Sequence, residues 1–265
     1  MRKLGIFMWF GYRLPVPERI ELIRETGYET VLHWWDDSFL EIEGFSREEQ
    51  ADLIRKAELE IENAHLSFEG INELWLDTAD GQALLERYLS DIDSLASCEI
   101  PVAVLHPSRG NDPPPASTLG MLRIRALVER AEKRGVRLAL ENVRAANNQT
   151  LFHILDALDS PMLGLCYDCG HDRVWSGAPY EILNRYGDRL FAVHLHDNMG
   201  VHDDHDVPGS GVVDWNAVRK GIGNSAYEGS YTLEGDSATL PPSRTAQEHL
   251  SLLYEGARRV LSPLE

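Results

Sequence analysis

Residues 137–171 read RLALENVRAANNQTLFHILDALDSPMLGLCYDCGH, and this stretch decides the fold. Its two ends, RLALENV and LGLCYDCGH, are short apolar runs of the kind that form buried strands. Between them, LFHILDALDS has apolar residues three and four positions apart, which is the spacing of an amphipathic helix. A strand, a helix and a second strand in this order are typical of a parallel βαβ unit.

The same alternation continues on both sides of this stretch. Further apolar runs stand beside segments with helical spacing, and these runs are KLGIFMW, ETVLHWW, EIENAHLSF, PVAVLHPS, LFAVHLHDN and YTLEGD. Eight repeats of strand and helix predict an α/β fold of the closed (β/α)8 type, the TIM barrel. A chain of 265 residues with 43% hydrophobic content fits one such domain, over residues 1–265, better than two small ones.

Local helix signals agree with this assignment. Gly27 and Gly135 come directly after helical segments, where a residue with positive φ commonly ends a helix. Ser46 followed by Glu49 has the pattern of a capping box, which predicts the first turn of another helix.

Composition narrows the class of function. No run of about eighteen apolar residues is present, and the start MRKLGIFMWFGYRLP lacks the features of a signal peptide, so we expect a cytoplasmic protein with no membrane partner. Three cysteines, Cys98, Cys166 and Cys169, predict reduced thiols, and we interpret Cys166 and Cys169 as packing residues. The net charge of −18 disfavours a nucleic-acid partner and is compatible with binding metal cations.

Acidic and histidine side chains stand where the predicted strands end. In a barrel of this type the active site lies at the carboxyl ends of the strands. Any one of these residues alone is more often a hydrogen-bonded core or surface group, but together they predict a metal site, because clustered carboxylates repel unless a cation neutralises them. Mixed oxygen and nitrogen donors suit Zn²⁺, Mn²⁺ or Co²⁺ better than Ca²⁺. The candidates are His65, His106, Glu141, Asp168, His171, His194 and Glu234. Of these, Asp168 and His171 are both placed at the end of the sixth strand.

The stretch 193–211, VHLHDNMGVHDDHDVPGSG, allows two interpretations. It is either a solvated polar loop or part of the metal site. His194 and His196 lie two apart and share one face of a strand, so one can bind a metal while the other orients a ligand. Asp203 and His205 follow on the loop, and PGSG turns the chain toward a helix that begins at Asp214.

Arginines and aromatic residues near the strand ends are candidates for substrate contacts. Arg109, Arg144 and Arg173 follow three successive strands and can bind a substrate phosphate or carboxylate, or pair with a surface acid. Trp34 and Trp35 are adjacent, so in an extended strand only one of them can face the mouth of the barrel.

The motifs taken together resemble a known family. HLHDN, then D-x-H-x-x-PGSG and DW, with LENV, YDCGH and LEGD on other strands, are similar to the xylose isomerase-like barrels. That group contains sugar and sugar phosphate isomerases and epimerases together with endonuclease IV. The resemblance runs from about His65 to Asp236, which is most of the chain.

The resemblance implies ligand sets for one to three divalent ions, Zn²⁺ or Mn²⁺ first, with Co²⁺ or Mg²⁺ also compatible. The epimerase pattern assigns one metal to Glu141, Asp168, His194 and Glu234, and makes Glu141 and Glu234 the acid/base pair. The endonuclease IV pattern adds His65 and His106 for a second ion, and His171, Asp203 and His205 for a third. Substrate contacts are expected from His171, His196, Arg173 and Trp34.

The expected function is therefore that of a metal-dependent isomerase or epimerase. It would act on a small sugar, sugar phosphate or polyol through a metal-stabilised enediolate. The alternative is a multinuclear zinc phosphodiesterase of the endonuclease type. His205 and Asp206 stand where the epimerase branch often has an arginine before the PG turn, which weakens the simple ketohexose assignment. The resemblance also allows a homo-oligomer.

Overall fold

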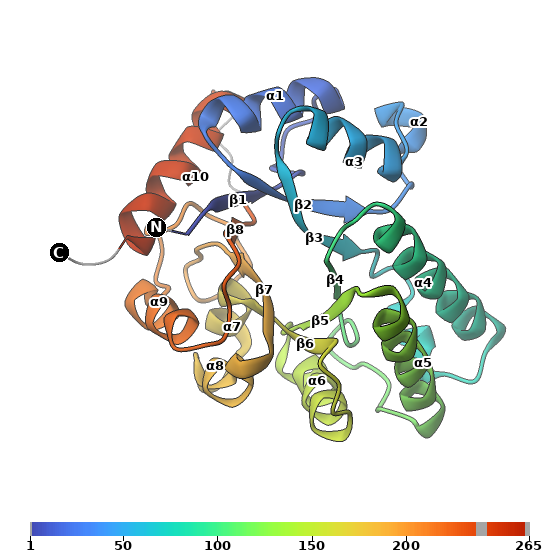
Figure 1. Cartoon of the computed structure of the whole chain (residues 1–265). Coiled ribbons are helices and arrows are strands. Elements are labelled where there is room, and N and C mark those ends of the chain that lie inside the picture. The colour runs from blue at the N-terminus through green and yellow to red at the C-terminus, as the bar shows by residue number, and fades with distance from the viewer. Residues whose placement is uncertain (1, 237–242, 263–265) are drawn as a thin grey trace.

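The structure, a computed structural model, describes residues 2–236 and 243–262. Eight parallel strands close into a barrel in which each strand pairs with the next and the eighth pairs with the first (Figure 1). The predicted (β/α)8 barrel is thereby confirmed. The strands are β1 Leu4–Phe7, β2 Thr30–Trp35, β3 Glu60–Leu66, β4 Val102–Leu105, β5 Arg137–Glu141, β6 Leu163–Asp168, β7 Leu190–Leu195 and β8 Tyr231–Leu233.

Helices surround the barrel and fill the connections between its strands (Figure 1). The outer elements are α1 Val16–Thr26, α3 Arg47–Lys56, α4 Ala79–Ser97, α5 Thr118–Arg134, α6 Ala145–Ala157, α8 Glu181–Tyr186, α9 Trp215–Gly223 and α10 Ala246–Leu261. Two short helices directly follow strands or their loops, α2 Leu40–Glu43 and α7 Cys169–Trp175, and two 3-10 turns span Ile71–Trp75 and Gly187–Arg189. No helix of the described ranges is both long and apolar enough to cross a bilayer.

The predicted helix ends are confirmed. Gly27 and Gly135 end α1 and α5 in the left-handed conformation, with φ of 102° and 71°. At the start of α3, the Ser46 side chain accepts from the backbone N–H of Glu49, and the Glu49 carboxylate accepts from the backbone N–H of Ser46. Each arrangement satisfies backbone groups that a helix terminus leaves without a partner.

The end of the sixth strand differs from the prediction. We expected LGLCYDCGH to run as a strand through His171, but β6 ends at Asp168 and α7 begins at Cys169. The Asp168 side chain accepts from the backbone N–H of His171 at 2.7 Å and so caps the helix. His171 therefore reaches the barrel mouth from the first turn of a helix.

The barrel interior is layered along its axis. Val104, Ala139, Cys166 and Ala192 form a small buried apolar cluster with Val102. Four of them lie two residues before His106, Glu141, Asp168 and His194, so they point to the same side one layer deeper. A much larger apolar core lies between strands and helices. The polar layer thus rests on a packed apolar floor at the carboxyl ends of the strands.

Candidate metal centre

Histidine and acidic side chains converge at the carboxyl ends of β3 to β8. Each residue predicted as a metal ligand belongs to a group whose donor atoms lie within 4.8 Å of one another. The groups are His65, His106 and Glu141; Glu141, Cys166 and His194; Glu141, Asp168 and His171; Asp168, His194 and Glu234; and His171, His196, Asp203 and His205. Because they share members, the groups form one continuous cluster.

Glu141 lies at the centre of this cluster, and its exposed fraction is 1%. Its Oε2 lies 2.9 Å from Nε2 of His65 and 3.2 Å from Nε2 of His106. Its Oε1 lies 3.3 Å from Nδ1 of His171 and 3.5 Å from Nδ1 of His194. Each carboxylate oxygen therefore has two imidazoles of its own, which is the arrangement of a carboxylate that can bridge two cations.

The group of Asp168, His194 and Glu234 passes a test for a metal position. Nδ1 of His194 lies 2.9 Å from Oε1 of Glu234, yet neither ring nitrogen of this fully buried histidine makes a hydrogen bond to any described residue. Close donor atoms without hydrogen-bond geometry are expected where lone pairs point at a common centre. The oxygen and nitrogen donors fit a divalent cation such as Zn²⁺ or Mn²⁺.

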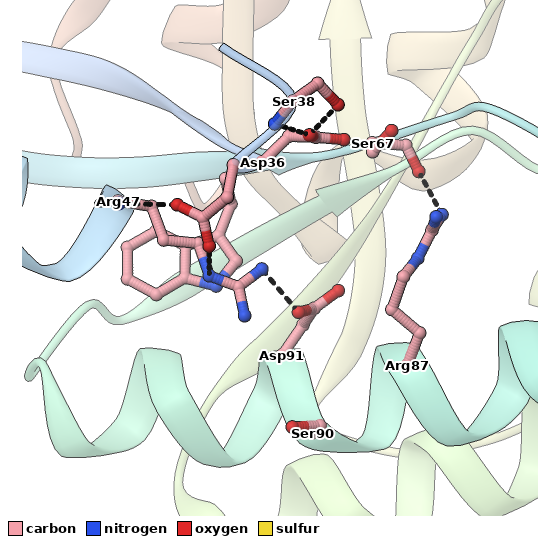
Figure 2. Close-up of a pocket in the computed structure, with 9 residues that line it drawn as sticks. Asp36, Ser38, Arg47, Ser67, Arg87, Ser90 and Asp91 are labelled. Carbon is pink, nitrogen blue, oxygen red and sulfur yellow. Dashed lines mark hydrogen bonds and ion pairs between the residues drawn. The ribbon is translucent and has the colours of Figure 1, made fainter. Parts of the chain in front are cut away.

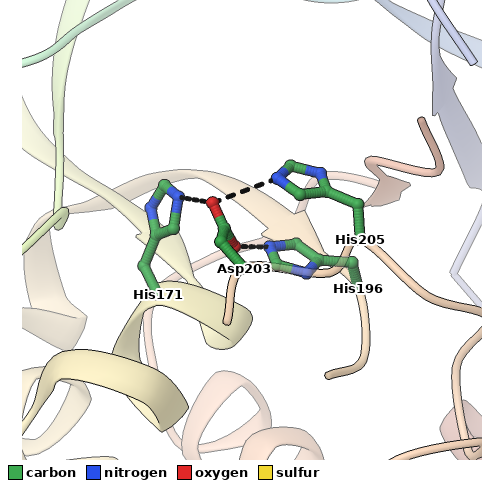
Figure 3. Close-up of side chains that lie close together, drawn as sticks. All are labelled: His171, His196, Asp203 and His205. Carbon is green, nitrogen blue, oxygen red and sulfur yellow. Dashed lines mark hydrogen bonds and ion pairs between the residues drawn. The ribbon is translucent and has the colours of Figure 1, made fainter. Parts of the chain in front are cut away.

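A second concentration of ligands surrounds Asp203 (Figure 3). Its Oδ2 lies 3.1 Å from Nε2 of His171 and 3.3 Å from Nε2 of His205, and its Oδ1 lies 3.6 Å from Nε2 of His196. The rings of His196 and His205 are parallel, with centroids 4.0 Å apart. The loop residues Asp203 and His205 therefore fold back onto the cluster, which favours the metal-site interpretation of this stretch over the solvated loop.

His205 is held in a strained backbone conformation. Its φ is 51°, which is uncommon for a residue with a side chain. Nδ1 lies 2.9 Å from Oδ1 of Asp236, which follows β8, while Nε2 faces Asp203. Contacts on both sides of the imidazole keep it in place, as is typical of strain at a functional site.

Asp197 holds the loop that carries Asp203 and His205, and the sequence analysis did not single it out. Its buried carboxylate accepts four N–H groups at 2.7–3.1 Å, namely the backbone amides of Asn198, Gly209 and Val213 and the Trp215 indole. Its backbone forms a two-bond bridge with Asp206. The only signal in the sequence was an aspartate directly after a strand and before a Gly-rich turn.

Asn142 was also missed. This fully buried residue follows Glu141, and its amide exchanges two hydrogen bonds of 2.8 Å with the backbone of Asp168. Its own carbonyl accepts from Nδ1 of His171 at 2.9 Å. Asn142 therefore fixes the relative positions of Glu141, Asp168 and His171.

The charges of the cluster shift the pKa values of its members in opposite directions. Burial disfavours ionisation of Glu141, but His194 and His106 outweigh it and hold the pKa of this carboxyl well below its usual value. Burial also disfavours the imidazolium forms, yet neighbouring acids raise the pKa of His171, His194 and His205 well above the usual value. Protons on imidazole therefore take the compensating role that a metal cation would otherwise have.

The predicted substrate contacts lie at different depths. Trp34 is half-buried and stacks on His65 at 5.4 Å, while Trp35 is fully buried beneath Arg47. The pair thus points in opposite directions, as predicted. His196 is fully buried and lies 3.1 Å from Asp168, which suits the predicted orienting role of one histidine of the pair.

The three arginines have different surroundings. Arg109 pairs with Glu69 at 2.8 Å, and Arg173 donates to the carbonyl of Val212 on the β7–α9 loop. Arg173 lies two positions from His171 in α7, so the two side chains leave different faces of the helix. Its role as a substrate contact stays a prediction. Arg144 lies against the Trp175 ring, with Cζ 4.2 Å from the centroid.

Both buried cysteines pack in the interior, as predicted. Cys169 begins α7, where its Sγ donates to the carbonyl of His196. Cys166 lies directly beneath the cluster, with Sγ within 4.8 Å of donor atoms of Glu141 and His194. Burial raises the pKa of Cys166 to about 12, so without a metal it packs beneath the site as a neutral thiol.

A separate cavity of about 360 Å³ does not coincide with this chemistry (Figure 2). It lies beside the residues that follow β2 and β3, against α4. Its charges are paired with one another, since Arg47 contacts Asp91 at 2.7 Å and Asp37 at 3.6 Å. We therefore place the functional site at the histidine and acidic cluster.

Comparison with known proteins identifies the family and agrees with the barrel fold. A family model described as "Xylose isomerase-like TIM barrel" matches residues 20–256. The structure of a D-tagatose 3-epimerase-like protein matches with a TM-score of 0.78 and 20% identity, covering 98% of this chain and 97% of that one. An IOLI protein solved with a zinc atom matches with a TM-score of 0.76 and 17% identity, at 98% coverage of both chains.

Curated relatives match over shorter regions. Uncharacterized protein y4fM of Sinorhizobium fredii is 37% identical over 99 residues, which are 36% of this chain and 32% of that protein. Inosose dehydratase of Clostridium beijerinckii is 29% identical over 127 residues, which are 40% of this chain and 42% of that enzyme. These alignments span less than half the length of each relative.

Removing the metal should change the pH dependence of stability. Without a metal, the fold raises the pKa of His171, His194 and His205. Their charged forms therefore add to the free energy of unfolding in full below about pH 6.5, and this stabilisation is lost as the pH rises through the raised pKa values. The Tm of chelator-treated protein should therefore fall above neutral pH, by about 2–4 °C per kcal/mol lost. Metal-loaded protein should resist this fall, because metal ligation requires neutral imidazoles. Parallel thermal melts across pH 6–9 check this, and curves of equal slope would contradict it.

Asp197→Asn should loosen the β7–α9 loop. It removes the charge from four hydrogen bonds and should lower the free energy of unfolding by roughly 2–3 kcal/mol, with a lower metal content per chain. Asp214→Asn is the matched control on the same segment, because Asn caps a helix about as well as Asp and should change stability by under about 0.5 kcal/mol. Urea unfolding and elemental analysis measure both effects. Equal behaviour of the two variants would contradict the anchoring role.

Proposed function

This chain belongs to the xylose isomerase-like TIM barrel family, and we propose that it is a divalent-metal-dependent isomerase or epimerase of a small sugar, sugar phosphate or related polyol. The observation that carries the proposal is the position of Glu141 and Glu234 around His194. Nδ1 of His194 lies 3.5 Å from one carboxylate and 2.9 Å from the other. Two carboxylates beside one histidine could act as the base and the acid that transfer a proton between the two faces of a substrate.

The residues that would hold the metal are Glu141, Asp168, His194 and Glu234. When bound, a divalent ion would stabilise negative charge on the oxygens of a hydroxy-ketone substrate. Asp168 and His194 are paired residues of adjacent strands, and both are fully buried, so they supply rigid support. Asn142 holds the backbone of Asp168, and His196 contacts its carboxylate.

Glu141 and Glu234 would move the proton. They stand on β5 and after β8, strands that are not neighbours in the barrel, so they approach the centre from different directions. Glu234 is the more accessible of the two, at 7% against 1% exposure. One carboxylate would remove a proton from the carbon next to a carbonyl and the other would return it on the opposite face.

The walls of the mouth suit a sugar-sized substrate. Trp34 and Phe68 are half-buried and face each other at 5.4 Å between ring centroids. Each also stacks on a histidine of the cluster, Trp34 on His65 and Phe68 on His106. Apolar ring faces beside convergent polar groups are typical of sugar-binding pockets. The similar proteins described above include a D-tagatose 3-epimerase-like protein and an inosose dehydratase, which agrees with this substrate class.

A second candidate, a multinuclear zinc phosphodiesterase, is favoured by the bridging position of Glu141 and by the ligands around Asp203. Two or three adjacent cations could stabilise the oxygens of a phosphoester. The net charge of −18 favours a small phosphoester over a nucleic acid in this case. The two candidates differ in whether Asp203 and His205 are needed for metal-dependent turnover.

Glu234→Gln should abolish the proposed reaction. Proton exchange between a carbon-bound substrate hydrogen and deuterated solvent should fall by at least about a hundredfold, because an amide cannot accept the proton. The matched variant Glu141→Gln should show the same loss, while Glu129→Gln, on an exposed residue of α5, serves as control. The isomerase proposal would be rejected if the metal-loaded parent protein catalysed no exchange with any member of a broad panel of sugars and sugar phosphates.

Asp203→Asn should separate the two candidates. In an isomerase with one metal, it should leave one ion per chain and keep exchange within about tenfold of the parent protein, since Asp203 touches neither Glu141 nor Glu234. In a multinuclear hydrolase, the same change should remove an ion and lower phosphodiester cleavage by about a hundredfold or more. Elemental analysis and both assays on one preparation decide between them.

A further inference from the structure

We propose that Arg144 and the first turn of α6 bind an anionic group of the substrate, either a phosphate or a carboxylate. This inference rests on the proposed function and narrows its substrate class from sugars in general to sugar phosphates or sugar acids. It concerns the connection from the end of β5, at Glu141, to the start of α6. None of the candidate metal ligands lies within this connection.

Arg144 is a guanidinium without an anionic partner. The chain has 43 acidic and 25 basic residues. Arg173, which follows the next strand, donates to the carbonyl of Val212. The Arg144 side chain is half-buried, and in the ranges 2–236 and 243–262 it forms neither an ion pair nor a hydrogen bond. Arg109, which follows the preceding strand, pairs with Glu69. An unpaired, partly desolvated cation in so acidic a protein is a candidate for binding an external anion.

The position of Arg144 is fixed by an aromatic ring that also touches the metal cluster. Its Cζ lies 4.2 Å from the centroid of Trp175, and that ring lies 5.1 Å from the ring of His171. The cation–π contact orients the guanidinium and leaves its N–H groups free to donate. Since Trp175 contacts both Arg144 and His171, the guanidinium lies near His171 at the edge of the cluster. A substrate that binds at the cluster could therefore also contact the guanidinium.

The first turn of α6 adds donors beside Arg144. Arg144 is the residue before the helix, and its side chain makes no capping hydrogen bond. The amides of Ala145, Ala146 and Asn147 precede the first amide with an intrahelical partner, that of Asn148, and no side chain of the described residues accepts from them. Free amides and the helix dipole favour an anion at such a terminus of a 13-residue helix.

Asn147 supplies a fully buried polar group in the same turn. Its Nδ2 donates to Oγ of Ser108 at 2.9 Å, and its Oδ1 has no partner among the residues that the structure describes. With the amide rotated by 180°, Oδ1 accepts from the Ser108 hydroxyl and the NH₂ group takes the position without a partner. In that orientation the first turn of α6 contains a further buried donor without a partner among the described residues.

Binding of matched ligand pairs to the metal-loaded protein tests this inference. Calorimetric titrations would compare neutral aldoses and ketoses with their phosphates and with the corresponding sugar acids. The parent protein should bind at least one anionic class more tightly than the neutral partners. Arg144→Gln should weaken that class by about tenfold to a hundredfold, and Arg144→Lys should recover part of the loss. Arg125→Gln, on an exposed arginine of α5, should bind as the parent protein does.

The outcomes separate this inference from the proposed function. The anion site is overturned if anionic ligands bind no tighter than neutral ones, or if they bind equally well to the parent protein and to Arg144→Gln. In either case, solvent exchange with neutral sugars can still support the isomerase. Arg144-dependent binding without solvent exchange supports the anion site and rejects the isomerase. Loss limited to phosphates identifies a sugar phosphate, and loss limited to carboxylates identifies a sugar acid.

Discussion

Glu141 and Asp168 are carboxylates removed almost completely from water, with exposed fractions of 1% and 0%. Buried charges of one sign destabilise a fold unless cations or hydrogen-bond donors compensate them. Six imidazoles surround these acids and Asp203, Glu234 and Asp236, and their acidic neighbours raise the pKa of His171, His194 and His205. Positive charge on these imidazoles compensates the buried carboxylates, which is the compensation that a bound divalent cation would also supply.

The same requirement explains the hydrogen-bonded supports around the cluster. A donor set works only if its members stay within a few tenths of an ångström of their positions. Asn142 joins the ends of β5 and β6, while Asp197 fixes the loop that carries Asp203 and His205. These two residues bind no metal in this arrangement, yet they determine the geometry of those that would. Asp168 has both roles, since it caps α7 and belongs to the donor set.

The sequence predicts the barrel and the convergence of the cluster's side chains because both depend on local patterns. Fully buried parallel strands read as apolar runs, and a ligand at a strand end is recognisable from its neighbours. The start of α7 was missed because a buried helix and a buried strand look alike over LGLCYDCGH. The role of Asp197, and the choice between an anion contact and an ion pair for Arg144, could not be read in this way. They depend on partners, or on the lack of partners, far away in the sequence, as the pairing of Arg109 with Glu69 forty residues earlier illustrates.

Aromatic rings cover three of the cluster's imidazoles and connect its chemistry to substrate selection. Trp34 lies against His65, Phe68 against His106 and Trp175 against His171. Each ring limits water access to an imidazole and fixes its orientation, which strengthens electrostatic interactions at the centre. Two of the rings also hold an arginine on their surface, Arg109 over Phe68 and Arg144 over Trp175. Glu69 neutralises the first arginine only, so the positive potential at the mouth is concentrated on the α6 side, and an anionic substrate would enter the site in one orientation.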